Sequence, residues 1–462
     1  MKKCRTTVFM TFVMLLVIAV PVTAEESPHW VKQWRDWAQQ TKNSEYIEWS
    51  EKISTPTAIQ LGKEWEEYLG YNAVDMVAKD QRAPSIKPGL VITRDNVAQY
   101  EKELRELMPF GFDYEVDRVM GTEGTYNAPL EMVILPTHHT YNDRGYLTAT
   151  KKYSKNCKIG EKTNLEGWVA GLPFPFPKTG LEIVHNYDRL TIMADNLNSM
   201  PAEFGLHGSK GERERVEKVE LHWRNYAGRI KIDPFPVIPG MEDVYEKGSI
   251  VALYPYDLRG FGAVRTRYKD PNIEDSFVTY IPSMRRIRRL AGSNTQDPLV
   301  GSDFTWEDWK GYWSKISLHK ANYEILGEDI MLCPSFHPNP PPVENKYGGL
   351  NQRYNFERRP VWIIKIDYDE PTYIYKSRVW VVDKETFYPR MMRYYDAKGR
   401  FWKFLDLSWR WNPDNGEQDY WGATNIDTIN KHSTALIHTI TLNMENISEN
   451  LFNLRYLSSK AH

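Results

Sequence analysis

The feature that most constrains the fold is a run of residues that alternate between apolar and polar. Residues 361–368, 373–383, 388–396 and 400–411 form four such stretches, separated by short turns. Gly399 in the last turn supplies a residue that tolerates a positive φ. We therefore predict four successive antiparallel strands, and a meander of strands this long builds a large curved sheet or barrel.

Composition agrees with a sheet that has one wet face. The chain of 462 residues contains 16 Trp, 28 Tyr and 17 Phe, yet its mean hydropathy is −0.58. Aromatic residues interleaved with polar ones suit strands better than helices packed into a dry core. The net charge of −2 gives no bulk electrostatic reason to bind nucleic acid.

The first residues are typical of a secretory signal peptide. Lys2, Lys3 and Arg5 precede a short apolar run that ends at the small-residue site 22–24. Cleavage after Ala24 removes those three cations and changes the net charge from −2 to −5. The sequence thus predicts export to the periplasm, where the protein could also associate with the outer membrane.

Four segments follow from the sequence. Residues 1–24 are the signal peptide, 25–80 an N-terminal helical segment, and 81–180 a Pro/Gly-rich segment packed on the main domain. Residues 181–462 form the curved antiparallel β domain. In the helical segment, tryptophans recur at helical spacing and either pack on the body of the protein or face a membrane or a partner. These tryptophans are Trp30, Trp34 and Trp37.

A Trp-rich helix is predicted near residues 303–317, inserted among the strands. Trp306, Trp309 and Trp313 share one helical face, and Thr305 with Asp308 resembles a capping box. The helix either packs into the core or acts as a plug or lid on the concave face of the sheet.

The strongest local charge feature is Arg285-Arg286-Ile287-Arg288-Arg289. On a strand, Arg285 and Arg289 share the face of Ile287, and Arg286 and Arg288 share the other face. Such a cluster either holds an anionic headgroup through forked hydrogen bonds or pairs with acidic residues on neighbouring strands.

No standard catalytic or cofactor-binding motif is present, so we predict a protein that is not an enzyme and uses no cofactor or metal. The adjacent His138 and His139 point to opposite faces of an extended segment, which is poor geometry for one metal ion. After signal cleavage, Cys157 and Cys333 remain, and they either form one disulfide or stay as two buried thiols.

Several motifs together resemble known exported proteins. Residues 302–308 resemble a motif of the outer-membrane lipoprotein-sorting proteins, the LolA/LolB-like group, and residues 380–399 resemble the paired-strand signature of that group. Residues 171–182 are similar to the proline-rich segment of the exported bacterial domain of unknown function family 1329. Pro136-Thr137-His138 and the arginine run 285–289 are similar to further stretches of that family.

The resemblance implies an α+β fold, mainly antiparallel β, in which helices close a large half-barrel sheet that binds acyl chains. It carries no catalytic residue to this chain. We therefore predict a periplasmic carrier or chaperone for a lipid, a lipoprotein acyl chain or another hydrophobic ligand. Its partners would be an inner-membrane exporter or an outer-membrane acceptor.

The expected ligand contacts fall into two groups. The expected apolar contacts are Trp306, Trp309, Trp313, Leu405, Leu407 and Trp409. The expected headgroup contacts are Arg285, Arg286, Arg288 and Arg289. Two alternatives remain open: a non-catalytic accessory subunit of an envelope complex, and a glycan-binding protein or hydrolase. Cavity content discriminates between them, because only a carrier needs a deep apolar cavity.

Overall fold

The computed structural model describes residues 28–122, 124–190, 194–289, 295–312, 315–336, 343–344 and 350–460. The predicted signal peptide and Trp313 lie outside these residues. Among the helices that the structure does describe, none is both long and apolar enough to cross a membrane.

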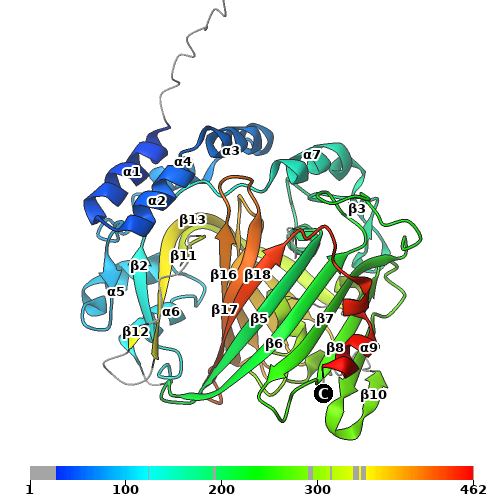
Figure 1. The fold of residues 1–462 in the computed structure, drawn as a ribbon. Coiled ribbons are helices and arrows are strands. Elements are labelled where there is room, and N and C mark those ends of the chain that lie inside the picture. Colours follow the sequence, from blue (N-terminus) through cyan, green and yellow to red (C-terminus); the bar gives the residue numbers. More distant parts are fainter. Residues whose placement is uncertain are drawn as a thin grey trace, which may run out of the picture.

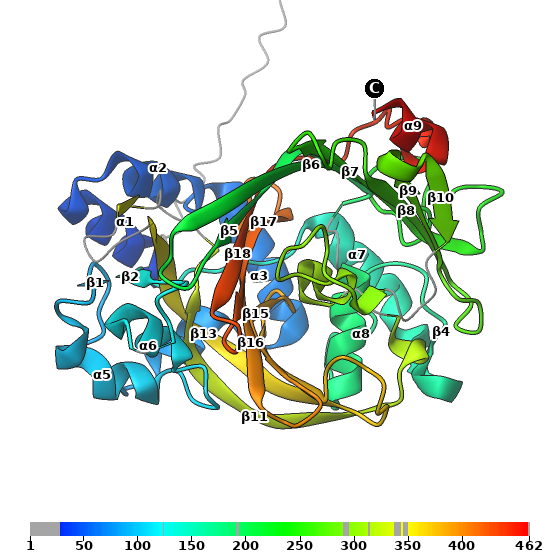
Figure 2. The ribbon, with the colours of Figure 1, turned by 90° about the horizontal axis from the view of Figure 1, so that it is seen from below.

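A sheet of 16 strands dominates the described part of the chain (Figure 1). Its order is β1-β2-β13-β14-β15-β16-β17-β18-β5-β6-β7-β8-β9-β10, and β11 and β12 also pair with β13. Strand β2 pairs with β13 in parallel, whereas the long central run from β13 to β10 is antiparallel. The sheet curves without closing (Figure 2), so the predicted α+β fold with an open, mainly antiparallel half-barrel is confirmed.

The strand bounds follow the chain. They are β1 (Val91–Ile92), β2 (Leu130–Ile134), β3 (Lys158–Ile159), β4 (Leu165–Glu166), β5 (Asn196–His207), β6 (Arg213–Asn225), β7 (Val244–Tyr254), β8 (Gly262–Tyr268), β9 (Ser276–Ile281), β10 (Arg286–Arg289), β11 (Ala321–Pro334), β12 (Val343–Glu344), β13 (Leu350–Tyr368), β14 (Ser377–Asp383), β15 (Pro389–Tyr395), β16 (Phe401–Trp411), β17 (Gln418–Asp427) and β18 (His432–Leu442). Strands β3 and β4 form a separate small ribbon.

The helices precede the sheet or flank it. They are α1 (His29–Thr41), α2 (Ser44–Lys52), α3 (Pro56–Leu69), α4 (Ala73–Ala78), α5 (Val97–Glu106), α6 (Tyr114–Met120), α7 (Arg144–Tyr153), α8 (Gly180–Leu190) and α9 (Leu454–Ser459). Short 3₁₀ turns include η3 (Pro282–Met284), η5 (Trp306–Gly311) and η6 (Ile316–Leu318).

The predicted four-strand meander is β13 to β16. Strand β13 begins at Leu350, well before the predicted residue 361, because its first half pairs with β2 rather than with β14. Strand β14 begins at Ser377 rather than at residue 373, because a turn precedes it. The alternation within each strand therefore placed the strands correctly, while pairing with distant segments set their ends.

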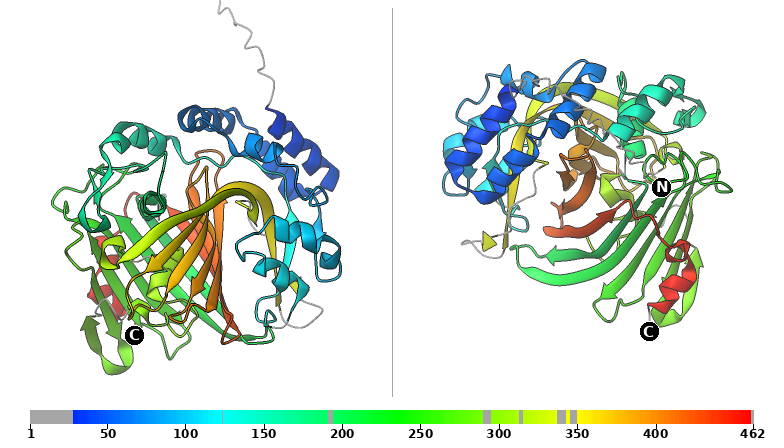
Figure 3. Two further views of the ribbon diagram at one scale, coloured as in Figure 1. Left: turned by 180° about the vertical axis from the view of Figure 1, so that it is seen from behind. Right: turned by 45° about the horizontal axis from the view of Figure 1, so that its top comes forward.

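The two faces of the sheet pack against different helices. On the outer face of β13 to β16, α5, α6 and the segment between them supply Leu104, Leu107, Phe112 and Val116 to one buried cluster. The concave face belongs to a larger cluster that also includes Trp34 and Trp65 from the N-terminal helices. Figure 3 shows those helices along one rim of the half-barrel. The tryptophan stripe of residues 30–37 thus packs mainly on the body of the protein.

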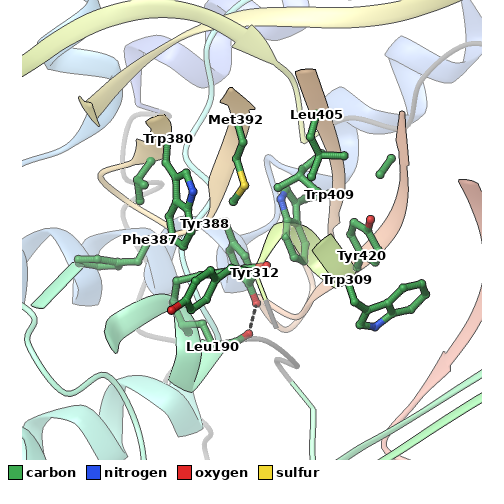
Figure 4. Close-up of a cluster of buried hydrophobic side chains, with 14 of the residues drawn as sticks. Leu190, Trp309, Tyr312, Trp380, Phe387, Tyr388, Met392, Leu405, Trp409 and Tyr420 are labelled. Carbon is green, nitrogen blue, oxygen red and sulfur yellow. Dashed lines mark hydrogen bonds between the residues drawn. The ribbon is translucent and has the colours of Figure 1, made fainter. Parts of the chain in front are cut away.

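Helix α8 fills part of the concave side (Figure 2). Its Tyr187 ring lies 5.8 Å from Trp380, 6.1 Å from Tyr388 and 6.4 Å from Trp409, each in edge-to-face geometry. The Tyr388 hydroxyl donates a hydrogen bond to the Leu190 carbonyl at the end of α8 (Figure 4). Aromatic contacts and one buried hydrogen bond therefore fix α8 against β14 to β16.

Candidate functional site

Residues 299–312, hereafter the plug, lie against the concave face. The predicted α-helix over 303–317 is wrong, because the structure has the separate 3₁₀ turns η5 and η6. The spacing of Trp306 and Trp309 fits a 3₁₀ turn as well as an α-helix. Gly311 ends η5 with φ 84°, and a Cβ there would lie 2.6 Å from Met392 Cε. The close approach to β15 therefore favours a short turn that ends in glycine.

The plug turns two tryptophans toward β6 to β9. Trp306 meets Phe277 edge-on with ring centroids 4.7 Å apart, and Trp309 stacks on Trp223 at 6.4 Å. Both tryptophans are buried in the concave-face core. The structure thus brings Trp306 and Trp309 together with the sheet, as the lid or core interpretation requires.

A small apolar cavity lies where the plug meets the sheet. It is lined by Leu221, Trp223, Gly248, Ser249, Ile250, Ala263, Arg265, Phe277, Leu299, Trp306 and Trp309. Its volume is about 10 Å³, which is the space of a single water molecule. Protein side chains therefore fill this part of the concave face, and the deep apolar cavity expected of a carrier is not found between the plug and the sheet in the described residues.

Polar groups hold the other side of the plug to the sheet. The buried Asp308 carboxylate accepts hydrogen bonds of 2.8 Å from the Tyr375 hydroxyl and lies 3.3 Å from Lys403 Nζ. Lys403 also donates to the Asp303 carbonyl at 2.6 Å. Burial raises the pKa of Tyr375 well above its usual value, so its hydroxyl stays protonated and donates. We call the contacts that Tyr375, Arg378, Tyr394 and Lys403 make with the plug the latch.

Arg378 of β14 completes the latch. Its guanidinium donates to the Gly311 carbonyl at 3.3 Å and to the Tyr373 hydroxyl at 2.8 Å. Tyr394 donates to the same Gly311 carbonyl at 2.9 Å. Five tyrosine rings surround the guanidinium carbon at 4.8 to 5.9 Å, an arrangement that favours a cation over aromatic faces. The latch thus ties η5 to three neighbouring strands.

The predicted apolar contacts on β16 lie elsewhere in the core. Leu405, Leu407 and Trp409 are buried but do not line the small cavity. The Trp409 ring lies 4.1 Å from Tyr388, and its Nε1 donates to the Pro389 carbonyl at 2.8 Å (Figure 4). Leu407 approaches the end of the plug at Gly311. These residues therefore support the plug and α8 rather than the cavity wall.

The arginine run lies at the free end of the sheet. Strand β10 pairs only with β9 among the described strands, and all four of its residues are exposed. Arg288 is the register partner of Thr279, which lies two residues beyond the cavity residue Phe277 on β9. Arg286 and Arg288 thus share the concave face with the cavity. The prediction that Arg285 lies on the strand with Arg289 is wrong, because its φ of 51° places Arg285 in the turn before β10.

The two cysteines do not form the disulfide that one interpretation offered. Cys157 is a partly buried free thiol and Cys333 a fully buried one on β11. The two histidines at 138 and 139 hydrogen-bond to different carboxylates, Glu357 at 3.2 Å and Glu385 at 2.8 Å. The two histidines and Cys333 therefore belong to the buried framework of the fold.

A larger cavity of about 580 Å³ lies between the N-terminal helices and residues 80–88. Its wall mixes apolar side chains with the ion pair between Arg82 and Asp80 at 2.9 Å. Charged side chains, among them Lys63, Glu66 and Arg358, line much of this cavity. By contrast, Arg265 is the one charged residue among the described residues that line the small cavity. The larger cavity therefore suits an acyl chain less well, because desolvating charged groups against hydrocarbon is unfavourable.

Sequence reasoning missed the latch residues Arg378 and Lys403. Their signal is a charged residue at an inward position of an otherwise apolar strand, as at Lys403 before Leu405 and Leu407. It also missed Trp223 and Phe277, the sheet partners of the plug.

A family model described as a protein of unknown function, DUF1329, matches residues 91–450. A solved structure described as an outer-membrane lipoprotein-sorting protein domain from Vibrio parahaemolyticus is 16% identical, with a TM-score of 0.42, and covers 60% of this chain and 97% of its own. A DUF1329 family protein from Desulfovibrio piger has 16% identity, a TM-score of 0.44 and the same coverages. A LolA superfamily protein from Nitrosomonas europaea has 11% identity, a TM-score of 0.38, and coverages of 61% and 100%. No curated protein matches the chain.

Proposed function

The chain belongs to the DUF1329 family, and we propose that it is a periplasmic, non-enzymatic carrier or chaperone for a hydrophobic molecule. The ligand binds the concave face of β6 to β9 after the plug leaves it. One observation carries the proposal: the plug meets the sheet through apolar side chains on one side and is held by the polar latch on the other.

Because the plug is held by polar contacts on one side and apolar contacts on the other, a ligand can replace it at a low free-energy cost. When the plug leaves, water replaces the hydrogen bonds of the latch, and each such bond contributes only about 0.5–1.5 kcal/mol net. The apolar wall around Trp223 and Phe277 is costly to expose at about 25 cal/mol per Å². An acyl chain restores that burial, so a ligand offsets the larger part of the cost of opening.

The arginines on the concave side of the sheet edge suit an anionic headgroup. Arg286 and Arg288 share the face of the cavity residue Phe277, are exposed, and form no ion pair with a described residue. Guanidinium groups bind phosphate or carboxylate through paired hydrogen bonds. We infer that the ligand is an amphiphile whose apolar chain enters beneath the plug and whose headgroup stays at β10.

Transfer requires partner proteins. A bound chain gains about 0.8 kcal/mol for each buried CH₂, so a long chain leaves slowly without help. An inner-membrane donor or an outer-membrane acceptor would release the ligand by stabilising the open plug.

The test uses a fluorescent fatty acid and a matched pair of variants. Ala263→Leu adds three carbons to the cavity wall, and Ala435→Leu makes the same change on the opposite face of the sheet, in the outer groove described below as the site of the second candidate function. Displacing about three CH₂ equivalents predicts a loss of about 2 kcal/mol in binding for Ala263→Leu. Ala435→Leu should bind like the parent. Equal affinities in both variants, or no uptake by the parent protein, would contradict the proposal. Weaker binding by Ala435→Leu than by Ala263→Leu would place the fatty acid in the outer groove and would also contradict it.

A second candidate function, a protein-binding accessory subunit, is favoured by one observation. A groove of about 90 Å³ lies where β13 faces β17 and β18, and Trp421 and the exposed Ile437 line it. Exposed apolar grooves are typical of sites for protein segments. A parent protein that takes up no fatty acid would shift the choice to this function.

A further inference from the structure

The hairpin of β9 and β10, residues 276–289, forms the end of the sheet. Figure 1 shows it projecting at the edge of the molecule, away from the N-terminal helices. Among the described strands β10 pairs only with β9, and the turn Pro282–Arg285 forms the tip. Helix α9 packs on the outer side of β8 and β9 through Leu457, in a cluster with Tyr280. The hairpin therefore has a fixed base and an exposed tip and edge.

Charge is concentrated on this hairpin. Arg285, Arg286, Arg288 and Arg289 are all exposed, and none forms an ion pair with a described residue. By contrast, arginines of the neighbouring strand β8 are buried in ion pairs, as Arg265 is with Asp275 at 2.5 Å. The whole chain carries a net charge of −2, so the hairpin is a local positive site on a protein of the opposite sign.

Two apolar side chains are exposed among these arginines. Met284 at the tip is 50% exposed and Ile287 on β10 is 56% exposed. Ile287 is the register partner of Tyr280 and Arg289 that of Val278, which places Ile287 and Arg289 on the outer face beside α9. The hairpin thus presents cations and apolar side chains together on its tip and its outer face.

We propose that the tip and outer face of the hairpin dock on the surface of a membrane that contains anionic phospholipid. The guanidinium groups of Arg285 at the tip and Arg289 on the outer face match phosphate headgroups, which they bind through forked hydrogen bonds. Met284 and Ile287 reach the boundary between headgroups and acyl chains, where a basic surface with apolar side chains gains affinity. An acidic protein surface would satisfy the arginines but gives no reason for the two exposed apolar side chains.

Docking has a consequence for the orientation of the molecule. The inner face of the hairpin, with Arg286 and Arg288, borders the cavity beneath the plug. Membrane contact at the outer face therefore places the open edge of the half-barrel next to lipid. The docking itself does not depend on the proposed carrier function, because it needs no ligand on the concave face.

The experiment measures binding of the mature protein to vesicles by flotation. One set contains phosphatidylcholine alone, and the other an equal mixture of phosphatidylcholine and phosphatidylglycerol. The parent protein should float only with the mixed vesicles and should be released by salt. Since one basic residue near an anionic surface contributes about fivefold in affinity, Arg285→Glu with Arg289→Glu should weaken binding by about 25-fold or more.

Two further variants separate the effect of the hairpin's charge from the effects of overall charge and of the exposed apolar side chains. Lys32→Glu with Arg35→Glu makes the same change in charge on exposed positions of α1, far from the hairpin, and should leave binding nearly unchanged. Met284→Ser with Ile287→Ser should weaken binding even at low salt. The proposal fails if the parent protein does not float with anionic vesicles, or if the α1 variant loses as much binding as the arginine variant. Vesicle binding that survives every hairpin variant would also overturn it.

Discussion

Removing Lys403 should unfasten the plug while leaving the sheet intact. Lys403 Nζ lies 3.3 Å from the fully buried carboxylate of Asp308 and 2.6 Å from the Asp303 carbonyl. Lys403→Met keeps the length of the side chain but leaves Asp308 with a more distant cation, Arg378 at 4.0 Å. Breaking a buried ion pair on one side costs about 3–5 kcal/mol. The remaining bond from Tyr375 keeps the expected loss near the lower end, about 3 kcal/mol.

Two readouts test this loss. Urea denaturation gives the free energy of unfolding, and hydrogen exchange reports the protection of residues 304–312 separately from that of β16. We expect faster exchange in the plug with little change in the strand. Adding Asp308→Asn to Lys403→Met removes the unpaired charge, so the double variant should lose less than the sum of the two single variants, by about 2 kcal/mol.

Lys365→Met is the matched control. Lys365 lies 2.5 Å from Asp367, but both side chains are about one-third exposed, and exposed ion pairs contribute about 0–1 kcal/mol. If Lys403→Met loses no more stability than Lys365→Met, or if plug exchange is unchanged, the latch does not hold the plug and the reasoning is refuted.

Three further predictions concern Trp309, Glu217 and the thiols. Trp309→Ala should reduce the free energy of unfolding by about 3–5 kcal/mol in urea denaturation, because it empties the stack on Trp223; a loss below 1 kcal/mol would contradict the packing. Burial raises the pKa of Glu217 to about 7, so the folded state retains a proton that the unfolded state loses near pH 4.5. The free energy of unfolding should therefore fall as pH rises from 4.5 to above 7. Glu217→Gln should abolish that fall, and a Glu217→Gln variant with the pH profile of the parent would contradict the assignment. Thiol titration of the denatured mature protein without reducing agent should detect both Cys157 and Cys333. In the native protein Cys333 should not react, because burial raises the pKa of its thiol and shields it from the reagent. A denatured protein without free thiols would show a disulfide and contradict this prediction.

The architecture could be predicted from the sequence because its signal is local. Each strand of the meander carries its own period-two pattern, as Leu405, Leu407 and Trp409 do on β16. The ends of β13 could not be predicted, because its first half pairs in parallel with β2, more than 200 residues earlier. Nothing within the sequence of β13 specifies that distant partner.

The functional face was predictable only in part. The spacing of Trp306 and Trp309 predicted a helix, but the same spacing fits both an α-helix and a 3₁₀ turn. The close approach of Gly311 to β15 favours the short 3₁₀ turn. The latch is a tertiary feature, because Asp308 lies 67 residues from Tyr375 and 95 from Lys403 in sequence. The position of Arg285 depended on a turn conformation that a strand pattern does not specify.

Native mass spectrometry, combined with lipid extraction, tests the central claim most directly. The protein is expressed with its own N-terminal residues, purified from the periplasm without detergent, and measured beside the Ala263→Leu and Ala435→Leu variants. The account predicts a bound amphiphile of defined mass on the parent and on Ala435→Leu, with reduced occupancy on Ala263→Leu. A bare protein mass for the parent, together with no uptake of fluorescent fatty acid, would contradict the carrier function.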